Sequence, residues 1–111
     1  MNKYKLIKNW EKKKFDTIID VRSPSEFTED HIIGAINCPV LFDLERDKVG
    51  KIYKKESTFK AKIIGSSITA RNIANHIEKH FVKQKGSWQP LIYCWRGGQR
   101  SKAFSIILSE V

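Results

Sequence analysis

The chain has few of the features that mark membrane or secreted proteins. None of its apolar runs approaches the roughly 18 residues that a membrane-crossing helix needs, and its first residues lead into no signal-type apolar segment. It has only two cysteines, too few for a disulfide framework, and it shows no internal repeat or low-complexity stretch. These absences favour a reducing, cytoplasmic location and exclude a membrane partner.

What is present fits one small globular domain covering residues 1–111, with an ordinary hydrophobic fraction of 41%. The charge is unbalanced, with 21 Lys and Arg against 12 Asp and Glu, a formal net charge of +9. This excess slightly favours a polyanionic partner such as a nucleic acid. Any single lysine is better explained as a solvated surface residue, and no basic–aromatic alternation typical of RNA-reading surfaces occurs along the sequence.

The most informative segment runs from Leu91 to Ser101. Residues 91–93 form a short apolar run after a proline, which predicts a buried strand. Residues 94–100 form a loop with two glycines and two arginines. Ser101 then precedes a helical apolar pattern, which predicts a helix with Ser101 as its N-cap.

This strand–loop–helix order places Cys94 at the mouth of an α/β sheet. Loop amides and the helix N-terminus would form an anion-binding nest around it, with Gly97 and Gly98 supplying positive φ values. The same field favours the thiolate, which is the nucleophilic form of cysteine. Cys94 is therefore the predicted catalytic residue, and no metal ligands are predicted. The predicted anion- and substrate-binding loop is Trp95, Arg96, Gly97, Gly98, Gln99 and Arg100.

Upstream, residues 15–21 predict a second buried strand, and Ser23 begins a short helix as N-cap, followed by Pro24. Gly34 indicates a turn before a short strand at 35–38. Polar residues in this region are predicted to be structural supports of the loop rather than catalytic groups: they are Asp20, Arg22 and Glu26. Cys38, in an apolar strand before a proline, is predicted to be buried.

Residues 41–85 are predicted to be mostly helical, because apolar side chains repeat at helical spacing. Gly50 and Gly65 are expected to interrupt these helices. Residues 4–14 contain a short apolar segment within a basic run, which is consistent with an edge strand and a short helix.

The motifs together resemble a known family. Cys94, five residues and Arg100 match the spacing of rhodanese-type sulfurtransferases and of the Cdc25-type cysteine phosphatases that share their fold. Cys-Trp-Arg-Gly-Gly, one variable residue and Arg-Ser is similar to the active loop in the rhodanese domain of bacterial tRNA 2-selenouridine synthase. The resemblance covers roughly residues 15–111. Its other matching positions are Asp20-Val21-Arg22, Pro24, Glu26-Phe27, His31-Ile32, Gly34 to Asn37, Pro39, Val49-Gly50 and Tyr53-Lys54.

The resemblance implies a three-layer α/β rhodanese-like fold with a mostly parallel sheet of about four strands. In that family the pattern continues past Val111 with a further strand and helix and then a P-loop domain. The further strand would lie between the first strand and the strand that ends at Cys94. Without it, an apolar edge would be open, and Phe104, Ile107 and Leu108 would partly face an empty slot. The resemblance also assigns His31, which alone could be taken for a general base, a structural role.

The implied function is sulfur or selenium transfer through a persulfide or selenosulfide on Cys94. Arg96 and Arg100 would hold an anionic donor, with selenophosphate as the expected co-substrate and no bound cofactor. The family converts wobble 2-thiouridine of tRNA to 2-selenouridine through a geranylated intermediate, which implies tRNA as a partner and geranyl diphosphate as a partner of the second domain.

Two alternatives stay open. A five-residue spacing between Cys94 and Arg100 is larger than the usual rhodanese loop and can seat phosphate or arsenate, as in a phosphatase or arsenate reductase. Against this, Ser101 is the only hydroxyl candidate near the loop, and no acid lies within it to protonate a leaving alkoxide. The other alternative is an incomplete module that only binds protein or RNA.

Overall fold

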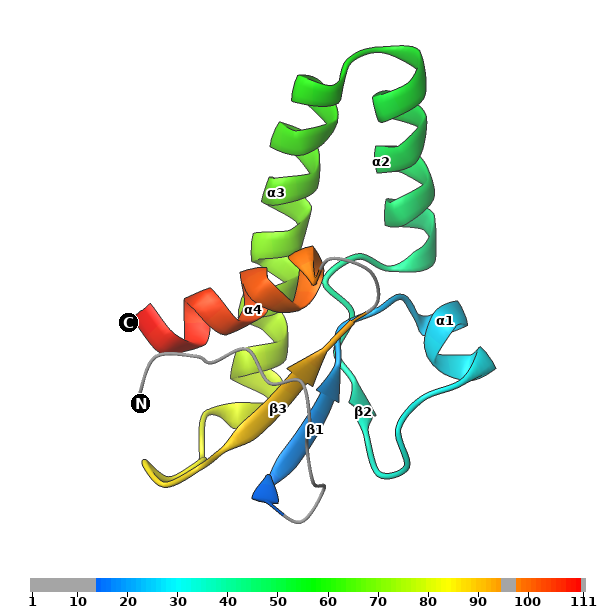
Figure 1. Ribbon diagram of the computed structural model, residues 1–111. Coiled ribbons are helices and arrows are strands. Elements are labelled where there is room, and N and C mark those ends of the chain that lie inside the picture. Colours follow the sequence, from blue (N-terminus) through cyan, green and yellow to red (C-terminus); the bar gives the residue numbers. More distant parts are fainter. Residues whose placement is uncertain (1–13, 95–97, 111) are drawn as a thin grey trace.

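The computed structural model describes residues 14–94 and 98–110. Its centre is a parallel three-stranded sheet with the order β2-β1-β3 (Figure 1). The strands are β1 (Thr17–Asp20), β2 (Ile36–Asn37) and β3 (Pro90–Tyr93). The helices are α1 (Pro24–Glu29), α2 (Asp43–Lys55), α3 (Thr58–His76) and α4 (Gln99–Glu110), with a π-helical turn, η2 (Ile77–Phe81), continuing α3. The predicted α/β class with parallel strands is confirmed.

The central strand β1 carries the core of the sheet. Ile18 and Ile19 are buried, as is Val21 just beyond the strand, as expected for a β-branched run in a parallel sheet. β1 pairs along its whole length with β3, from Thr17 opposite Pro90 to Asp20 opposite Tyr93. On its other side β1 pairs with β2 through Ile19 and Asp20. All three strands therefore end at the same edge of the sheet.

The other edge of β3 is paired with no strand in the described part of the chain. All four β3 residues are half-buried rather than buried. The strand expected within residues 4–14 lies outside the described residues. The expectation that Phe104 would partly face an empty slot is wrong, because Phe104 is fully buried in the core cluster, near the ring of His76. α4 thus directs this side chain toward α3 rather than toward the sheet edge.

The predicted helical region forms a long hairpin, α2–α3, that rises from the edge where the strands end (Figure 1). The expectation that Gly50 and Gly65 interrupt the helices is wrong, since Gly50 lies within α2 and Gly65 within α3. A Cβ atom on Gly65 would lie 3.4 Å from a methyl group of Val49. Gly65 therefore faces α2, and a Cβ atom there would make an ordinary van der Waals contact; the helix continues through Gly65 despite its low helix propensity.

The two turns that follow β1 match their sequence signals. Ser23 precedes α1 with Pro24 at its first position, and the Glu26 carboxylate accepts a hydrogen bond from the Ser23 backbone N–H (3.1 Å). Gly34 has a φ of 88°, a conformation that favours glycine, so the predicted turn there is confirmed.

The start of the last helix differs from its prediction. α4 begins at Gln99, so Ser101 lies in its first turn and is not its N-cap. Gly98, with a φ of 67°, precedes the helix, and its carbonyl accepts the first helical hydrogen bond, from Lys102 N–H (2.9 Å). The helix thus starts three residues earlier than the hydroxyl signal indicated, after the positive φ of Gly98.

Candidate active site

Cys94 directly follows β3 at the edge where all three strands end, and it is half-buried. Its sulfur faces the first turn of α4. The Cys94 S–H donates to Ser101 Oγ (3.3 Å), and the Ser101 backbone N–H donates to the sulfur (3.4 Å). The positive end of a 12-residue helix therefore lies next to the sulfur, where the helix dipole would stabilise a bound anion.

Ser101 holds this position through a second contact. Its hydroxyl donates to the Gly98 carbonyl oxygen (3.1 Å) while accepting from Cys94. When the sulfur is ionised, the same hydroxyl can rotate to donate to it, because hydroxyl hydrogens are free to turn. The sequence pattern indicated Ser101 as a helix N-cap and as the hydroxyl considered for the phosphatase alternative, so its contact with Cys94 was missed as part of the predicted site.

The predicted binding loop is described in part. Gly98, Gln99 and Arg100 lie at the start of α4. Trp95, Arg96 and Gly97 lie outside the described residues. The nest that was predicted from all six residues therefore stays a prediction.

Arg100 makes a two-point contact with the carboxylate of Glu26. Its Nη1 lies 2.7 Å from Oε1 and its Nη2 lies 3.3 Å from Oε2. Arg46 of α2 also pairs with Glu26 (2.8 Å). One half-buried carboxylate thus connects α1, α2 and α4 next to the loop. Burial raises the pKa of Glu26, but the hydrogen bonds from Arg100 and Ser23 outweigh it and lower the pKa to about 2.

A buried ion pair underlies the same edge of the sheet. Asp20 accepts from Arg22 Nη2 (2.8 Å) and from the Tyr93 hydroxyl (2.8 Å), and Asp20 and Arg22 are almost completely buried. Arg22 also pairs with Asp30 (3.2 Å), beyond the end of α1. The hydrogen bond to Asp20 raises the pKa of Arg22, and burial raises that of Tyr93 to about 12. These residues therefore fix the segments that follow β1 and β3.

The structure also gives the surroundings of His31 and Cys38, which the sequence alone did not define. The His31 ring stacks on Phe27, with 3.7 Å between the ring centroids, and its Nδ1 hydrogen-bonds the Phe27 carbonyl oxygen (2.7 Å). These contacts are with α1, as a structural residue would make. Cys38 is completely buried, as predicted, and this burial raises the pKa of its thiol to about 11. Of the two thiols, Cys94 is the accessible one.

Comparison with known families identifies the class. The model of the rhodanese-like domain family matches residues 3–110, and the chain belongs to this family. Its fold is also similar, with a TM-score of 0.68 and 31% identity, to a crystal structure described as the "N-terminal domain of putative ATP/GTP binding protein from Clostridium difficile 630", over 85% of this chain and 73% of that one.

The chain is also similar to individual curated proteins. The chain is 34% identical to a tRNA 2-selenouridine synthase of Psychromonas ingrahamii over 93 residues, and 35% identical to one of Bdellovibrio bacteriovorus over 96 residues; each match covers 84% of this chain. It spans about a quarter of the length of these relatives, 26% and 25% respectively. None of the described helices is long and apolar enough to cross a membrane.

Proposed function

We propose that the domain carries sulfur or selenium on Cys94 as the rhodanese part of a tRNA 2-selenouridine synthase. The observation that carries this proposal is the placement of an accessible cysteine sulfur at a strand end, 3.4 Å from a helix N-terminal amide. The relatives that share the motifs are named tRNA 2-selenouridine synthases. The accessible sulfur argues against the binding-module alternative, and the names of the relatives favour chalcogen transfer over the phosphatase alternative.

The chemistry requires a thiolate and an anion site. The Cys94 thiolate attacks the terminal sulfur or selenium of a donor, and the bond from that atom to the rest of the donor breaks. The electron pair leaves with the rest of the donor, as sulfite from thiosulfate or as a thiolate from a small-molecule persulfide or selenosulfide. The selenium of selenophosphate is already at the selenide level, so for this donor Cys94 must first be oxidised to a mixed disulfide by a disulfide co-substrate. The selenium then attacks the Cys94 sulfur and displaces the thiolate, and water cleaves the phosphorus–selenium bond to release phosphate. The product is a persulfide or selenosulfide anion on Cys94. The Ser101 N–H and the α4 dipole support this anion until an acceptor takes the chalcogen.

Glu26 orients the guanidinium of Arg100, which would bind an anionic donor. Two of the guanidinium nitrogens face the carboxylate of Glu26, and this fixes the orientation of the guanidinium beside the loop. Arg100 and Arg96 would then hold the donor, for which selenophosphate is the proposed physiological compound. Phosphate should protect Cys94 from alkylation, and Arg100→Ala should weaken this protection more than Lys102→Ala. Equal effects would show that general positive charge, and not a shaped site, attracts the anion.

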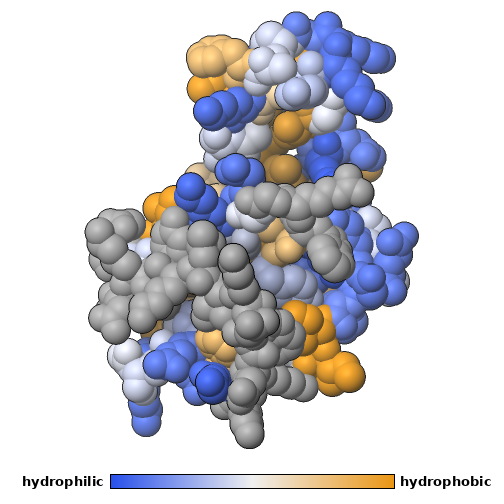
Figure 2. Space-filling model, in the orientation of Figure 1, coloured by the Kyte–Doolittle hydropathy of each residue, from blue (hydrophilic) through white to orange (hydrophobic). Residues whose placement is uncertain are grey.

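The α2–α3 hairpin offers a surface for the tRNA. Residues 48–62 contain six lysines and one glutamate, and the lysines are exposed. The side chains of Tyr53 and Phe59, in the same segment, are 60% and 71% exposed, so two aromatic rings stand among the lysines. Figure 2 shows hydrophilic residues gathered beside hydrophobic ones at the end of the hairpin. Cations bind phosphates and aromatic rings stack on unpaired bases.

Charge-matched variants test this surface. Replacing Lys54 and Lys55 with glutamine should weaken tRNA binding and reduce the slope of log affinity against log salt by roughly two. Replacing Lys83 and Lys85, which are also exposed, removes the same charge elsewhere. If both pairs weaken binding equally, the hairpin is not the binding surface.

The function itself is tested by supplying three substrates to the same protein: thiosulfate, selenophosphate with a disulfide, and an aryl phosphate. Chalcogen transfer that is lost in Cys94→Ser supports the proposal. Turnover of the aryl phosphate alone supports the phosphatase alternative, and no turnover with any donor supports the binding module. Conversion of 2-thiouridine in tRNA, with geranyl diphosphate as a further substrate, is proposed for the longer protein.

A further inference from the structure

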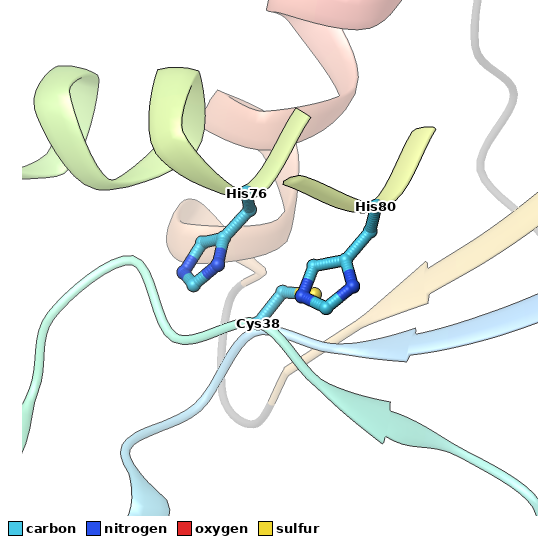
Figure 3. Close-up of side chains that lie close together, drawn as sticks. All are labelled: Cys38, His76 and His80. Carbon is cyan, nitrogen blue, oxygen red and sulfur yellow. The ribbon is translucent and has the colours of Figure 1, made fainter. Parts of the chain in front are cut away.

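A second group of reactive side chains lies away from Cys94. Cys38, His76 and His80 each offer one ligand atom, and these three atoms lie within 4.8 Å of one another. Figure 3 shows the two imidazole rings and the thiol facing a common space between the helical segment and the end of β2. None of the three contributes to the site around Cys94.

The fold brings these residues together from two segments. Cys38 directly follows β2, His76 is the last residue of α3, and His80 lies in the π-helical turn η2. The two histidines are four residues apart and therefore lie on the same side of the helix. A π-helical turn is rare and is often found at functional sites. Here it places His80 over the thiol that ends β2.

The hydrogen bonding of His76 prepares it to act as a ligand. Its Nε2 lies 2.8 Å from the Pro39 carbonyl oxygen, an acceptor, so Nε2 carries the proton and Nδ1 keeps its lone pair. In Figure 3 one ring nitrogen of His76 points toward Cys38 and His80, and the other points away from them. A histidine that is fixed by a carbonyl at one nitrogen and binds a metal ion at the other is a common arrangement.

From this geometry we propose that Cys38, His76 and His80 form a binding site for a cation that prefers thiolate and imidazole ligands, with Zn²⁺ as the most suitable. Zinc is bound by Cys and His at about 2.0–2.3 Å, which places tetrahedral ligand atoms about 3.5 Å apart. The ligand atoms here must therefore move closer by about 1 Å on binding. His80 is exposed, so it can make this movement and it provides the entry path.

The surroundings define the properties of the site. Cys38 is fully buried, so its thiol is neutral without the metal and releases its proton to solvent when the ion binds. The charge of Lys79 acts on both Cys38 and His76 and repels a cation. The fourth coordination position is left to water on the exposed side of His80. A bound ion would join the end of β2 to η2 and stabilise the fold.

Cobalt(II) provides a direct test, since a cobalt–thiolate bond gives a charge-transfer absorption band. Titration of the reduced protein should produce this band with one equivalent of Co²⁺, and Zn²⁺ should displace it. Cys38→Ser should abolish the band, and His80→Gln should weaken Co²⁺ binding at least about tenfold. Lys79→Gln should strengthen the binding.

The chain supplies matched controls, because it has one other cysteine and one other histidine. Cys94→Ser and His31→Gln should leave the band and the affinity unchanged. His80→Gln alters an exposed side chain, so the test does not depend on whether Cys38→Ser folds. A protein without the band, a band lost in Cys94→Ser, or an affinity unaffected by His80→Gln would overturn the proposal. These readouts do not depend on any transfer activity of Cys94.

Discussion

Glu26→Gln removes the charge that connects Arg100 to α1 and leaves the size of the side chain unchanged. The carboxylate has its pKa lowered from 4.5 to about 2, and each pKa unit corresponds to 1.36 kcal/mol, so the charge stabilises the fold by at most about 3 kcal/mol. The glutamine can still accept from Ser23, and the pair with Arg46, whose side chain is 49% exposed, contributes little because solvent screens it. We therefore expect a loss of about 2 kcal/mol in the free energy of unfolding.

The effect has a defined pH dependence. Because the pKa of Glu26 is lower in the folded protein, its stabilisation is fully present above about pH 4.5 and is lost as the pH falls toward 2. Urea unfolding across this range should show the two proteins converging at the acid end. The matched control is Glu29→Gln, an exposed change on the same helix, which should cost less than about 0.5 kcal/mol. Equal losses in the two variants, independent of pH, would refute the reasoning.

Three further predictions concern the thiols and the buried acid. Alkylation of the native protein, followed by peptide mapping, should label Cys94 and spare Cys38, whose burial raises its pKa to about 11; preferential labelling of Cys38 at neutral pH would contradict this. Ser101→Ala should slow alkylation of Cys94 by about tenfold, since a hydrogen bond to a charged sulfur contributes about 1.5 kcal/mol. Ser109→Ala, on the same helix, should not change the rate, and matching rates in both variants would mean that the hydroxyl does not act on the sulfur. Asp20→Asn should lower the free energy of unfolding in urea by about 3–5 kcal/mol, because it leaves a buried guanidinium without its counter-charge; a loss below 1 kcal/mol would show that the pair adds little.

Much of the fold could be predicted because its signals are local. The apolar run before Cys94, the Ser23-Pro24 helix start and the turn at Gly34 each depend on a few neighbouring residues. The start of α4 was misplaced because a serine next to a helical pattern is an N-cap signal, whereas the positive φ of Gly98 decided the boundary. Gly65 was misjudged because glycine lowers helix propensity locally, whereas α3 packs against α2 and continues through this position.

The contacts around the candidate site could not be predicted from spacing alone. Glu26 and Arg100 are 74 residues apart in sequence, and no local pattern indicates that they pair. The group of Cys38, His76 and His80 could not be predicted from sequence either. The four-residue spacing of the two histidines indicates only that they share one face of a helix. The third member comes from the end of β2, and only the packing of η2 against the sheet brings it near.

Mass spectrometry of the protein after reaction with a chalcogen donor tests the central claim most directly. The protein is incubated with thiosulfate, or with selenophosphate and a disulfide that first oxidises Cys94 to a mixed disulfide, and is then freed of small molecules and digested without reductant. We predict one added sulfur or selenium on the peptide that contains Cys94, removable by excess thiol, retained in Cys38→Ser and absent in Cys94→Ser. An adduct confined to Cys38, or no adduct on a folded protein that hydrolyses an aryl phosphate, would contradict the assignment of Cys94 as a chalcogen carrier.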